Sequence, residues 1–442
     1  MGLATFKGGV HPYEGKELSE NKPVQVLMPK GDLVSQGIGA PANPLVKKGD
    51  RVLAGQIIGE AGGFISANVI CSVSGTVKAV EPRRVASGGM VNSVVVENDG
   101  QYEAVEGMGA DRDPATLSKQ EIRDIVKAAG IVGMGGAGFP TNVKLSPKNE
   151  DAIEYILING AECEPYLTSD YRCMMEDPEK IIGGLKVVLQ LFDKAKGVIG
   201  IENNKPEAIK KLKELVKDEP RIEVCELLTK YPQGGERSLI YAVTGRSVNS
   251  SMLPADAGCI VDNIGTVIAI YDAVCKTTPL IERVFTVTGD AIADPRNFRI
   301  KIGTNTQELI EAAGGFKSEP EKVISGGPMM GFAMFDLDVP VIKTNGSVLC
   351  MTKDQVAASV ETPCIRCGKC VSACPSHIVP VMMMKAALKG DCDTFEKLNG
   401  MECMECGSCT FVCPAKRPLT QAFKEMRKTV AANRRKKAQG GK

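Results

Sequence analysis

The 442-residue sequence contains no tryptophan and only two histidines, which effectively excludes metal sites built on histidine. It also has no segment that approaches the ~18 uninterrupted apolar residues that a membrane-spanning helix requires. The N-terminus lacks the apolar core of a signal peptide, so we expect the protein to remain in the cytosol. The formal net charge of only +1 gives no reason to expect nucleic acid as a partner.

Cysteine, in contrast, is abundant, with sixteen residues. The cytosol keeps thiols reduced, so metal or redox chemistry is a better interpretation than disulfides. Eight cysteines are scattered singly, and each is expected to be a small buried apolar residue. These are Cys71, Cys163, Cys173, Cys225, Cys259, Cys275, Cys350 and Cys392.

The other eight cysteines form two runs with one pattern, C-x2-C-x2-C-x3-C-P. Residues 364–375 read CIRCGKCVSACP, and residues 403–414 read CMECGSCTFVCP. In this pattern three cysteines bind one 4Fe-4S cluster and the fourth binds the cluster of the other run. Zinc is disfavoured, because a four-cysteine zinc site does not require this spacing or the proline. We predict one cluster on Cys364, Cys367, Cys370 and Cys413, and another on Cys403, Cys406, Cys409 and Cys374.

Apolar residues near the runs are expected to pack around the clusters. Ile365 and Val412 are predicted to shield the sulfurs, and Met382, Met383 and Met384 to fill gaps as methionine does elsewhere. His377 is expected to lie on the surface.

The rest of the chain predicts a multidomain fold of the α/β and α+β classes. "VKKGDRVLAGQ" and "SVSGTV" resemble the barrel-sandwich fold of biotinyl and lipoyl domains. No lysine lies between Arg51 and Lys78 to carry the modification, so this part should be a scaffold. The predicted order is a β barrel-sandwich domain at 1–112, an α/β domain at 113–282, a β-grasp-like (soluble-ligand-binding-type) domain at 283–352, a helical two-cluster ferredoxin-like domain at 353–418, and a basic tail at 419–442.

The stretch "GMGGAGFPTNVK", residues 133–144, indicates a phosphate-binding loop. Its glycines allow backbone N–H groups to approach an anion closely. A helical pattern precedes it and the buried strand pattern "DAIEYILING" follows. A tight surface turn is the alternative interpretation of these residues alone.

Together with "NGAECEPYLTSDYR", "YPQGGERSLIYAVTGR" and "VDNIGT", this loop resembles the FMN- and NADH-binding subunit of respiratory complex I. The resemblance implies that the loop and its lysine hold the FMN phosphate, that two asparagines contact the flavin and its ribityl chain, and that an aromatic ring and three carboxylates line the NAD(H) site. The residues implied are Gly133, Gly135, Gly136, Gly138 and Lys144 for the phosphate, Asn159 and Asn263 for the flavin, and Phe139, Glu162, Glu164 and Glu236 for NAD(H).

Four positions depart from that pattern. Met134 replaces an arginine, Gly235 a glutamate, Ala161 an aspartate and Asp262 an asparagine. These departures leave the expectation of FMN intact and mainly affect the expected orientation of NADH in the site.

The whole chain resembles the C subunit of the Rnf complex, the membrane-bound ferredoxin:NAD oxidoreductase that couples electron flow to Na+ or H+ transport. The "GGVHPYEGK" start and the order of the four domains carry this resemblance. The A subunit of the Na+-pumping quinone reductase lacks the cysteine runs, and the corrinoid-activating flavin reductase lacks the N-terminal barrel.

The resemblance implies an electron-transfer subunit that exchanges hydride between NADH or NAD+ and FMN. Single electrons would then pass through two 4Fe-4S clusters to or from the complex, without a catalytic acid or base from the protein. Expected partners are the iron-sulfur B subunit of the Rnf complex and its membrane subunits, with the chain peripheral on the cytoplasmic side of the cell inner membrane. The alternatives are a soluble diaphorase, a corrinoid reductase, and an electron-transfer scaffold without nucleotide.

The C-terminal tail is strongly basic, with ten Lys or Arg against one Glu in residues 416–442. Such a run is more typical of a solvated, disordered terminus. The other interpretation is that it helps docking at the membrane through residues 434–437, "RRKK".

Overall fold

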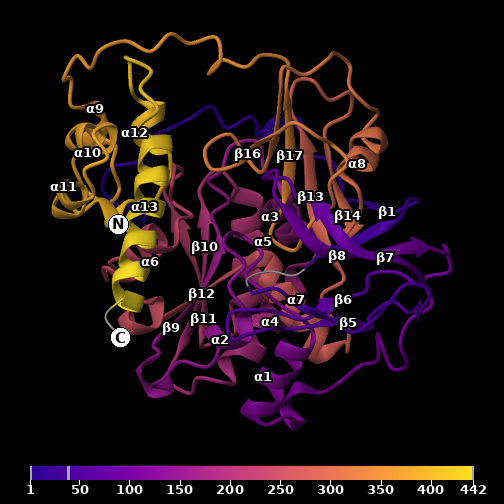
Figure 1. The fold of residues 1–442 in the computed structure, drawn as a ribbon. Helices are drawn as coiled ribbons and strands as arrows, with labels where there is room; N and C mark the ends of the chain where they lie inside the picture. The colour runs from indigo at the N-terminus through magenta and orange to yellow at the C-terminus, as the bar shows by residue number, and fades with distance from the viewer. Residues whose placement is uncertain (1, 37–39, 441–442) are drawn as a thin grey trace.

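The computed structural model describes residues 2–36 and 40–440. The α/β domain occupies the middle of the molecule, with the cysteine-run domain on one side and the two β domains on the other (Figure 1). The multidomain α/β fold class predicted from the sequence is confirmed. The described residues also contain five short 3-10 helices, at Lys16–Leu18, Pro114–Thr116, Glu150–Ala152, Pro254–Ala257 and Gly400–Glu402.

The α/β domain is built on a parallel sheet of order β11-β10-β9-β12. Its strands alternate between two cores: Ile156 and Ile158 of β9 join the core beneath most of the helices, and Leu157 joins the core beneath α6. The chain runs outward through β10 and β11 and then returns to the other side of β9, so the switch point of the sheet lies between β9 and β12. The strands are β9 (Tyr155–Gly160), β10 (Lys196–Glu202), β11 (Ile222–Leu227) and β12 (Cys259–Asn263).

Local sequence signals account for the helices of this domain. Ser118 and Glu121 form a capping box on α1, and prolines begin α4 and α5. Asn263 caps α7 by accepting a hydrogen bond from the Gly265 amide at 2.8 Å. The helices are α1 (Lys119–Ala128), α2 (Thr141–Lys144), α3 (Ser169–Glu176), α4 (Pro178–Leu189), α5 (Pro206–Val216), α6 (Glu236–Thr244) and α7 (Ile264–Cys275).

The barrel-sandwich part has two antiparallel sheets around a valine-rich core. In the long hairpin of β7 and β8, the first four residues of β7 alternate between buried and exposed, whereas β8 buries the four consecutive residues 93–96. The strands are β2 (Leu33–Gln36), β3 (Asn43–Pro44), β4 (Arg51–Val52), β5 (Ile57–Glu60), β6 (Val69–Ile70), β7 (Gly75–Arg84) and β8 (Met90–Asn98).

The β-grasp-like part is a six-stranded sheet that packs on α8. One of its edges is β1, which pairs in parallel with β14 and comes from the N-terminal segment. The prediction that this strand belongs to the barrel was wrong, because its register partners lie in the other sheet. The elements are β1 (Gln25–Leu27), β13 (Glu282–Thr288), β14 (Arg296–Lys301), α8 (Thr306–Ala312), β15 (Lys322–Ser325), β16 (Phe332–Met334) and β17 (Ser347–Met351).

The residues before β1 cross the α/β domain instead of entering the barrel. Ala4 pairs with Leu227 at the end of β11, and Val10 pairs with Tyr231. The Gly9 amide donates to the Ala373 carbonyl of the cysteine-run domain at 2.9 Å. The N-terminal segment therefore joins the α/β domain to the cysteine runs.

The cysteine-run domain is helical, and its last helix contains the basic segment. The preference for a disordered terminus was wrong over Leu419–Gly440, because Leu419, Phe423, Met426 and Val430 recur at helical spacing and are buried against α10 and α11. Figure 1 shows this helix, in yellow, beside the other helices of the domain. The helices are α9 (Lys369–Ser372), α10 (Pro380–Leu388), α11 (Cys392–Lys397), α12 (Ser408–Phe411) and α13 (Leu419–Gly440).

Candidate functional site

The predicted flavin-binding residues gather at the carboxyl edge of the parallel sheet. Asn159 is the next-to-last residue of β9 and Asn263 is the last residue of β12, and the two are register partners at the switch point. Ligands of open α/β sheets bind at such a point. Gly135 packs closely there, because a Cβ on it would lie 3.0 Å from the side chain of Asn263.

The glycine-rich loop has the form of an anion cradle. Among the described residues, none accepts a hydrogen bond from the amides of Gly135, Gly136 or Ala137, which form an exposed turn. Gly138 adopts a φ of 69°, a conformation that favours glycine. The donors and the open space at Gly136 fit a phosphate group.

Lys144, on α2, lies beside this loop. A Cβ on Gly133 would stand 3.3 Å from its Nζ. The same Nζ donates to the Val261 carbonyl at 2.9 Å and to the Asp262 carboxylate at 3.2 Å. Burial raises the pKa of Asp262, and Lys144 opposes that shift.

Glu236, in the first turn of α6, faces this pair. The surrounding protein raises the pKa of its carboxyl, Lys144 opposes the shift and Asp262 adds to it. The side chain is nevertheless open to solvent, as a residue at the mouth of a nucleotide site would be.

Glu162 and Glu164 bind the protein's own backbone. Glu162 accepts hydrogen bonds from the amides of Asp170 and Tyr171 at 2.7 and 3.2 Å, where α3 begins. Glu164 accepts from the amides of Met329 and Met330 at 2.7 and 3.0 Å. Both carboxylates therefore hold the loop after β9, and Glu164 ties it to the β-grasp-like part.

Two buried lysines hold the same loop from below. Lys16 donates to the carbonyls of Glu162, Glu164 and Leu167. Lys205 donates to the Ala161 carbonyl at 2.7 Å and lies 3.6 Å from the Glu202 carboxylate. Sequence reasoning gave neither residue a role. Lys16 ends the stretch GGVHPYEGK, but the carbonyls to which Lys16 and Lys205 donate are distant in the sequence, and no local pattern points to them.

The flavin asparagines are also hydrogen bonded within the protein. Asn159 donates to the Gly234 carbonyl at 2.8 Å, and Asn263 donates to the Asp170 carboxylate at 2.6 Å. Phe139 is half-buried at the end of the glycine-rich loop. The structure thus brings all the predicted flavin and nucleotide positions to one edge of one sheet, except for Glu164, which faces the β-grasp-like part.

The two cysteine runs adopt the same backbone. The N-cap residues of α9 and α12 are glycines, Gly368 and Gly407, with φ of 78° and 83°. Two residues before each cap, Arg366 and Glu405 also have positive φ, of 57° and 55°. The amides of Arg366 and Glu405 both approach the sulfur of the run's first cysteine at 3.4 Å. Two similar loops that offer N–H groups to sulfur fit two similar clusters.

The fourth cysteine of each run lies with the other run. Burial raises the pKa of the Cys374 thiol, and nearby Cys406 adds to the shift. Burial likewise raises the pKa of Cys370, to which Cys413 adds. Over the residues that the structure describes, no three Cys, His, Asp or Glu side chains converge tightly enough for one metal ion. The thiolates of a 4Fe-4S cubane each bind a different iron.

The surroundings of the runs differ. Cys364 and Cys367 are exposed, and Ile365 between them has 67% of its surface exposed, so the prediction that it shields the sulfurs was wrong. Val412 packs with Tyr231 and Cys406, as predicted for a shielding residue. Met383 and Met384 are buried, whereas Met382 is exposed.

The second run contacts the α/β domain directly. A Cβ on Gly235 would stand 3.0 Å from Met404 Cε, and Gly234 is the residue that accepts from Asn159. Because Gly235 lacks a side chain, Met404 can approach the carboxyl edge of the sheet. The glycine at position 235, where the complex I subunit has a glutamate, thus makes room for Met404.

Family models match each part of the chain. They are the RnfC barrel sandwich hybrid domain at residues 4–101, the Nuo51 FMN-binding domain at 126–272, the SLBB domain at 284–333 and the 4Fe-4S dicluster domain at 363–416. The fold and its sites define a flavin and iron-sulfur electron-transfer protein.

Curated relatives cover nearly the whole chain. The C subunit of the proton-translocating ferredoxin:NAD(+) oxidoreductase complex of Clostridium ljungdahlii is 45% identical over 99% of this chain and 96% of that protein. The C subunit of the Na(+)-translocating ferredoxin:NAD(+) oxidoreductase complex of Acetobacterium woodii is 46% identical over 98% of each. The C subunit of the ion-translocating oxidoreductase complex of Pseudomonas aeruginosa is 39% identical over 98% of this chain and 57% of that protein. The chain belongs to the family of the Rnf complex C subunit.

Among solved structures, an NAD+-reducing [NiFe]-hydrogenase in the H2-reduced state shares the fold with a TM-score of 0.51. It is 19% identical and covers 72% of this chain and 61% of its own. In the described parts of the chain, no helix is both long enough and apolar enough to cross a membrane.

The function and cofactors predicted from the sequence are therefore confirmed at the level of the family. The chain is an electron-transfer subunit of an Rnf complex, with FMN and two 4Fe-4S clusters as cofactors. Binding of NAD fits the flavin domain.

Proposed function

We propose that NADH or NAD+ and FMN bind at the carboxyl edge of β9 and β12, and that the cysteine runs carry electrons between this edge and a partner protein of the complex. FMN, when bound, exchanges two electrons as hydride with nicotinamide and single electrons with iron-sulfur clusters. The residues of the chain bind and orient these groups, and no catalytic acid or base is required from the protein.

Each predicted site residue has a role in this proposal. The phosphate lies on the amides of the glycine-rich loop and near Lys144, while Asn159 and Asn263 contact the flavin and its ribityl chain. Phe139 and Glu236 line the nucleotide site. Glu162 and Glu164 shape that site through the loop that they hold, because their oxygens already accept backbone amides.

The observation that carries the proposal is the contact between Gly235 and Met404. It supports a position of the second run next to the proposed flavin edge, while the exposed Cys364 and Cys367 leave the first run open to solvent. We infer that the cluster on Cys403, Cys406, Cys409 and Cys374 is nearer the flavin. The cluster on Cys364, Cys367, Cys370 and Cys413 then faces the partner.

The partner in this proposal is the iron-sulfur B subunit of the Rnf complex. Arg366 and Lys369 are exposed within the first run, so an acidic surface on the partner would complement it. The chain would lie peripherally on the cytoplasmic side of the inner membrane, bound mainly through the other subunits. The domain limits 1–112, 113–282, 283–352, 353–418 and 419–442 remain part of the proposal, with the N-terminal segment shared among domains.

A visible spectrum of the anaerobically purified protein tests this proposal. Flavin absorption that bleaches on addition of NADH is expected, followed by loss of iron-sulfur absorption. The Cys374→Ser variant should still bleach its flavin but reduce its remaining cluster slowly. Iron-sulfur absorption with no flavin, even after incubation with FMN, would contradict the proposal.

A further inference from the structure

Lys144 already has a buried counter-ion. Its Nζ lies 3.2 Å from Asp262 Oδ1, and the Asp262 side chain is completely inaccessible to solvent. Within residues 2–36 and 40–440, no hydrogen bond reaches Asp262 Oδ2. A buried carboxylate oxygen without a partner is costly, so this side chain depends on the lysine for compensation.

The charges at this position are unfavourable for a phosphate. Lys144 faces the carboxyl groups of both Asp262 and Glu236, and it contacts Asp262 directly. Arg237, the other cation that faces Glu236, is already paired with Glu402. An arriving phosphate must therefore share Lys144 with Asp262. In a partly buried site such repulsion is only weakly screened.

We propose that Asp262 weakens binding of the FMN phosphate by competing for Lys144, and so makes the flavin exchangeable. This inference rests on the proposed flavin site and identifies the residue that sets its affinity. Asp262 is singled out because it contacts the lysine directly.

The test is to measure the affinity of the flavin-depleted full-length protein for FMN by fluorescence titration. Asp262→Asn keeps the size and the acceptor oxygen but removes the charge. The dissociation constant for FMN should fall at least about tenfold, whereas that for riboflavin, which has no phosphate, should not change.

Two controls define the measurement. Asp193→Asn removes an aspartate that also pairs with a lysine, Lys119, but on the surface, and should leave FMN affinity unchanged. In a Lys144→Met background, Asp262→Asn should have a much smaller effect, because the lysine for which the groups compete is absent.

The possible outcomes are distinct. An unchanged or weaker FMN affinity in Asp262→Asn would overturn the inference, since Asp262 would then be neutral or would position Lys144. An equal gain for riboflavin would also overturn it. If the protein with Asp262 intact bound neither flavin, the proposed function would fail instead.

Discussion

The guanidinium group of Arg237 on α6 lies 3.0 Å from the carboxylate of Glu402, the residue that precedes the second cysteine run. The same carboxylate accepts hydrogen bonds from the amide and hydroxyl of Ser250. Glu402 thus fastens the second run to the α/β domain beside the Gly235–Met404 contact. If the flavin and the second-run cluster bind as proposed, this attachment helps to set the distance between them.

Replacing Glu402 with alanine should loosen the attachment without removing a cluster ligand. The lost ion pair and hydrogen bonds are worth about 1–2 kcal/mol. Reduction of the clusters by NADH, followed by stopped-flow absorbance, should slow several-fold while iron and FMN contents stay constant. Glu425→Ala, which removes an exposed pair on α13, is the control. An unchanged reduction rate in Glu402→Ala would show that this contact does not set the distance.

Cys409→Ser and Cys374→Ser should deplete the same cluster, although the two residues belong to different runs. The reason is that Cys374 and Cys409 lie close to each other in the core of the domain. EPR spin quantitation of the reduced proteins measures which signal is lost. Cys392→Ser, in the same domain but outside the runs, should keep both signals. If Cys374→Ser instead lost the EPR signal of the cluster bound by Cys364, Cys367 and Cys370, the crossed assignment would be refuted.

Lys343 should make stability depend on pH above neutrality. Its Nζ donates to the carbonyls of Asn68 and Gly130, at 2.7 Å each, and burial lowers its pKa to about 7. Between pH 7 and the ordinary lysine pKa, the unfolded chain binds more protons, so this residue makes the free energy of unfolding rise with pH.

Lys343→Met should remove that contribution, which is at most about 1.4 kcal/mol per pH unit for one proton. Denaturant unfolding at pH 7, 8 and 9 measures the slope against the unsubstituted protein. Lys48→Met changes an exposed lysine and should keep the original slope. Parallel pH profiles for Lys343→Met and the unsubstituted protein would mean that Lys343 stays charged in the folded state.

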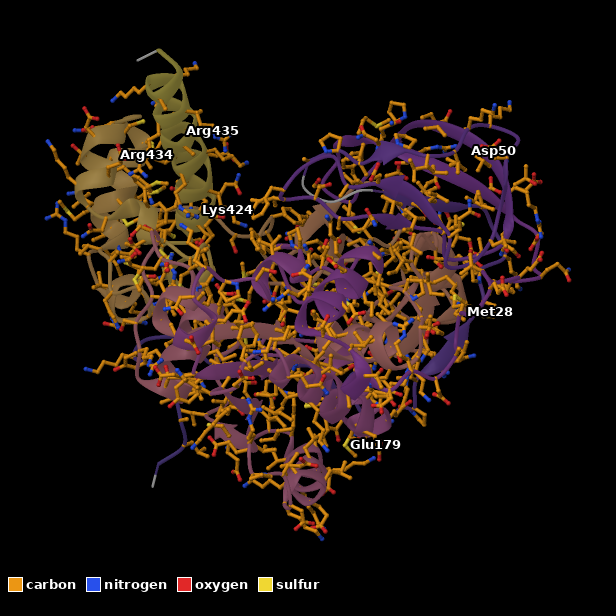
Figure 2. All side chains as sticks on the ribbon, turned by 90° about the horizontal axis from the view of Figure 1, so that it is seen from below. Met28, Asp50, Glu179, Lys424, Arg434 and Arg435 are labelled. Atoms are coloured by element: carbon orange, nitrogen blue, oxygen red, sulfur yellow. The ribbon has the colours of Figure 1, made fainter. Side chains whose placement is uncertain are left out.

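Truncation after Ala432 should weaken membrane association without unfolding the cysteine-run domain. It removes Arg434, Arg435, Lys436 and Lys437 but keeps the four buried apolar residues of α13. Figure 2 shows Arg434 and Arg435 towards the end of this helix, far from Asp50 of the barrel. Each basic residue near an anionic leaflet contributes ~1 kcal/mol, so the effect should be clear at low salt and small at high salt.

Sedimentation with membranes at both salt concentrations tests this prediction, and the iron content serves as the check on folding. Lys428→Ala removes one exposed charge from the middle of α13 and should have a smaller effect. Equal sedimentation of the truncated and full-length proteins at low salt would mean that the end of the helix plays no part in attachment.

The sequence by itself determined the chemistry of the sites. The spacing of the cysteine runs predicted the two clusters, because three ligands of each cluster lie within one short loop. The glycine-rich loop and Lys144 are likewise close in the chain, so local conformation brings them together. The burial of α13 could also have been predicted, because Leu419, Phe423, Met426 and Val430 show its apolar stripe in the sequence.

Only the tertiary structure decided what these local units contact. Nothing near β1 in the sequence indicates that it completes a sheet more than 250 residues away, and nothing near Glu164 indicates the amides of Met329 and Met330. The same is true of Met404 against Gly235 and of Asp262 against Lys144. Local patterns fix backbone conformation and ligand type, whereas these contacts depend on the packing of whole domains, which no short segment specifies.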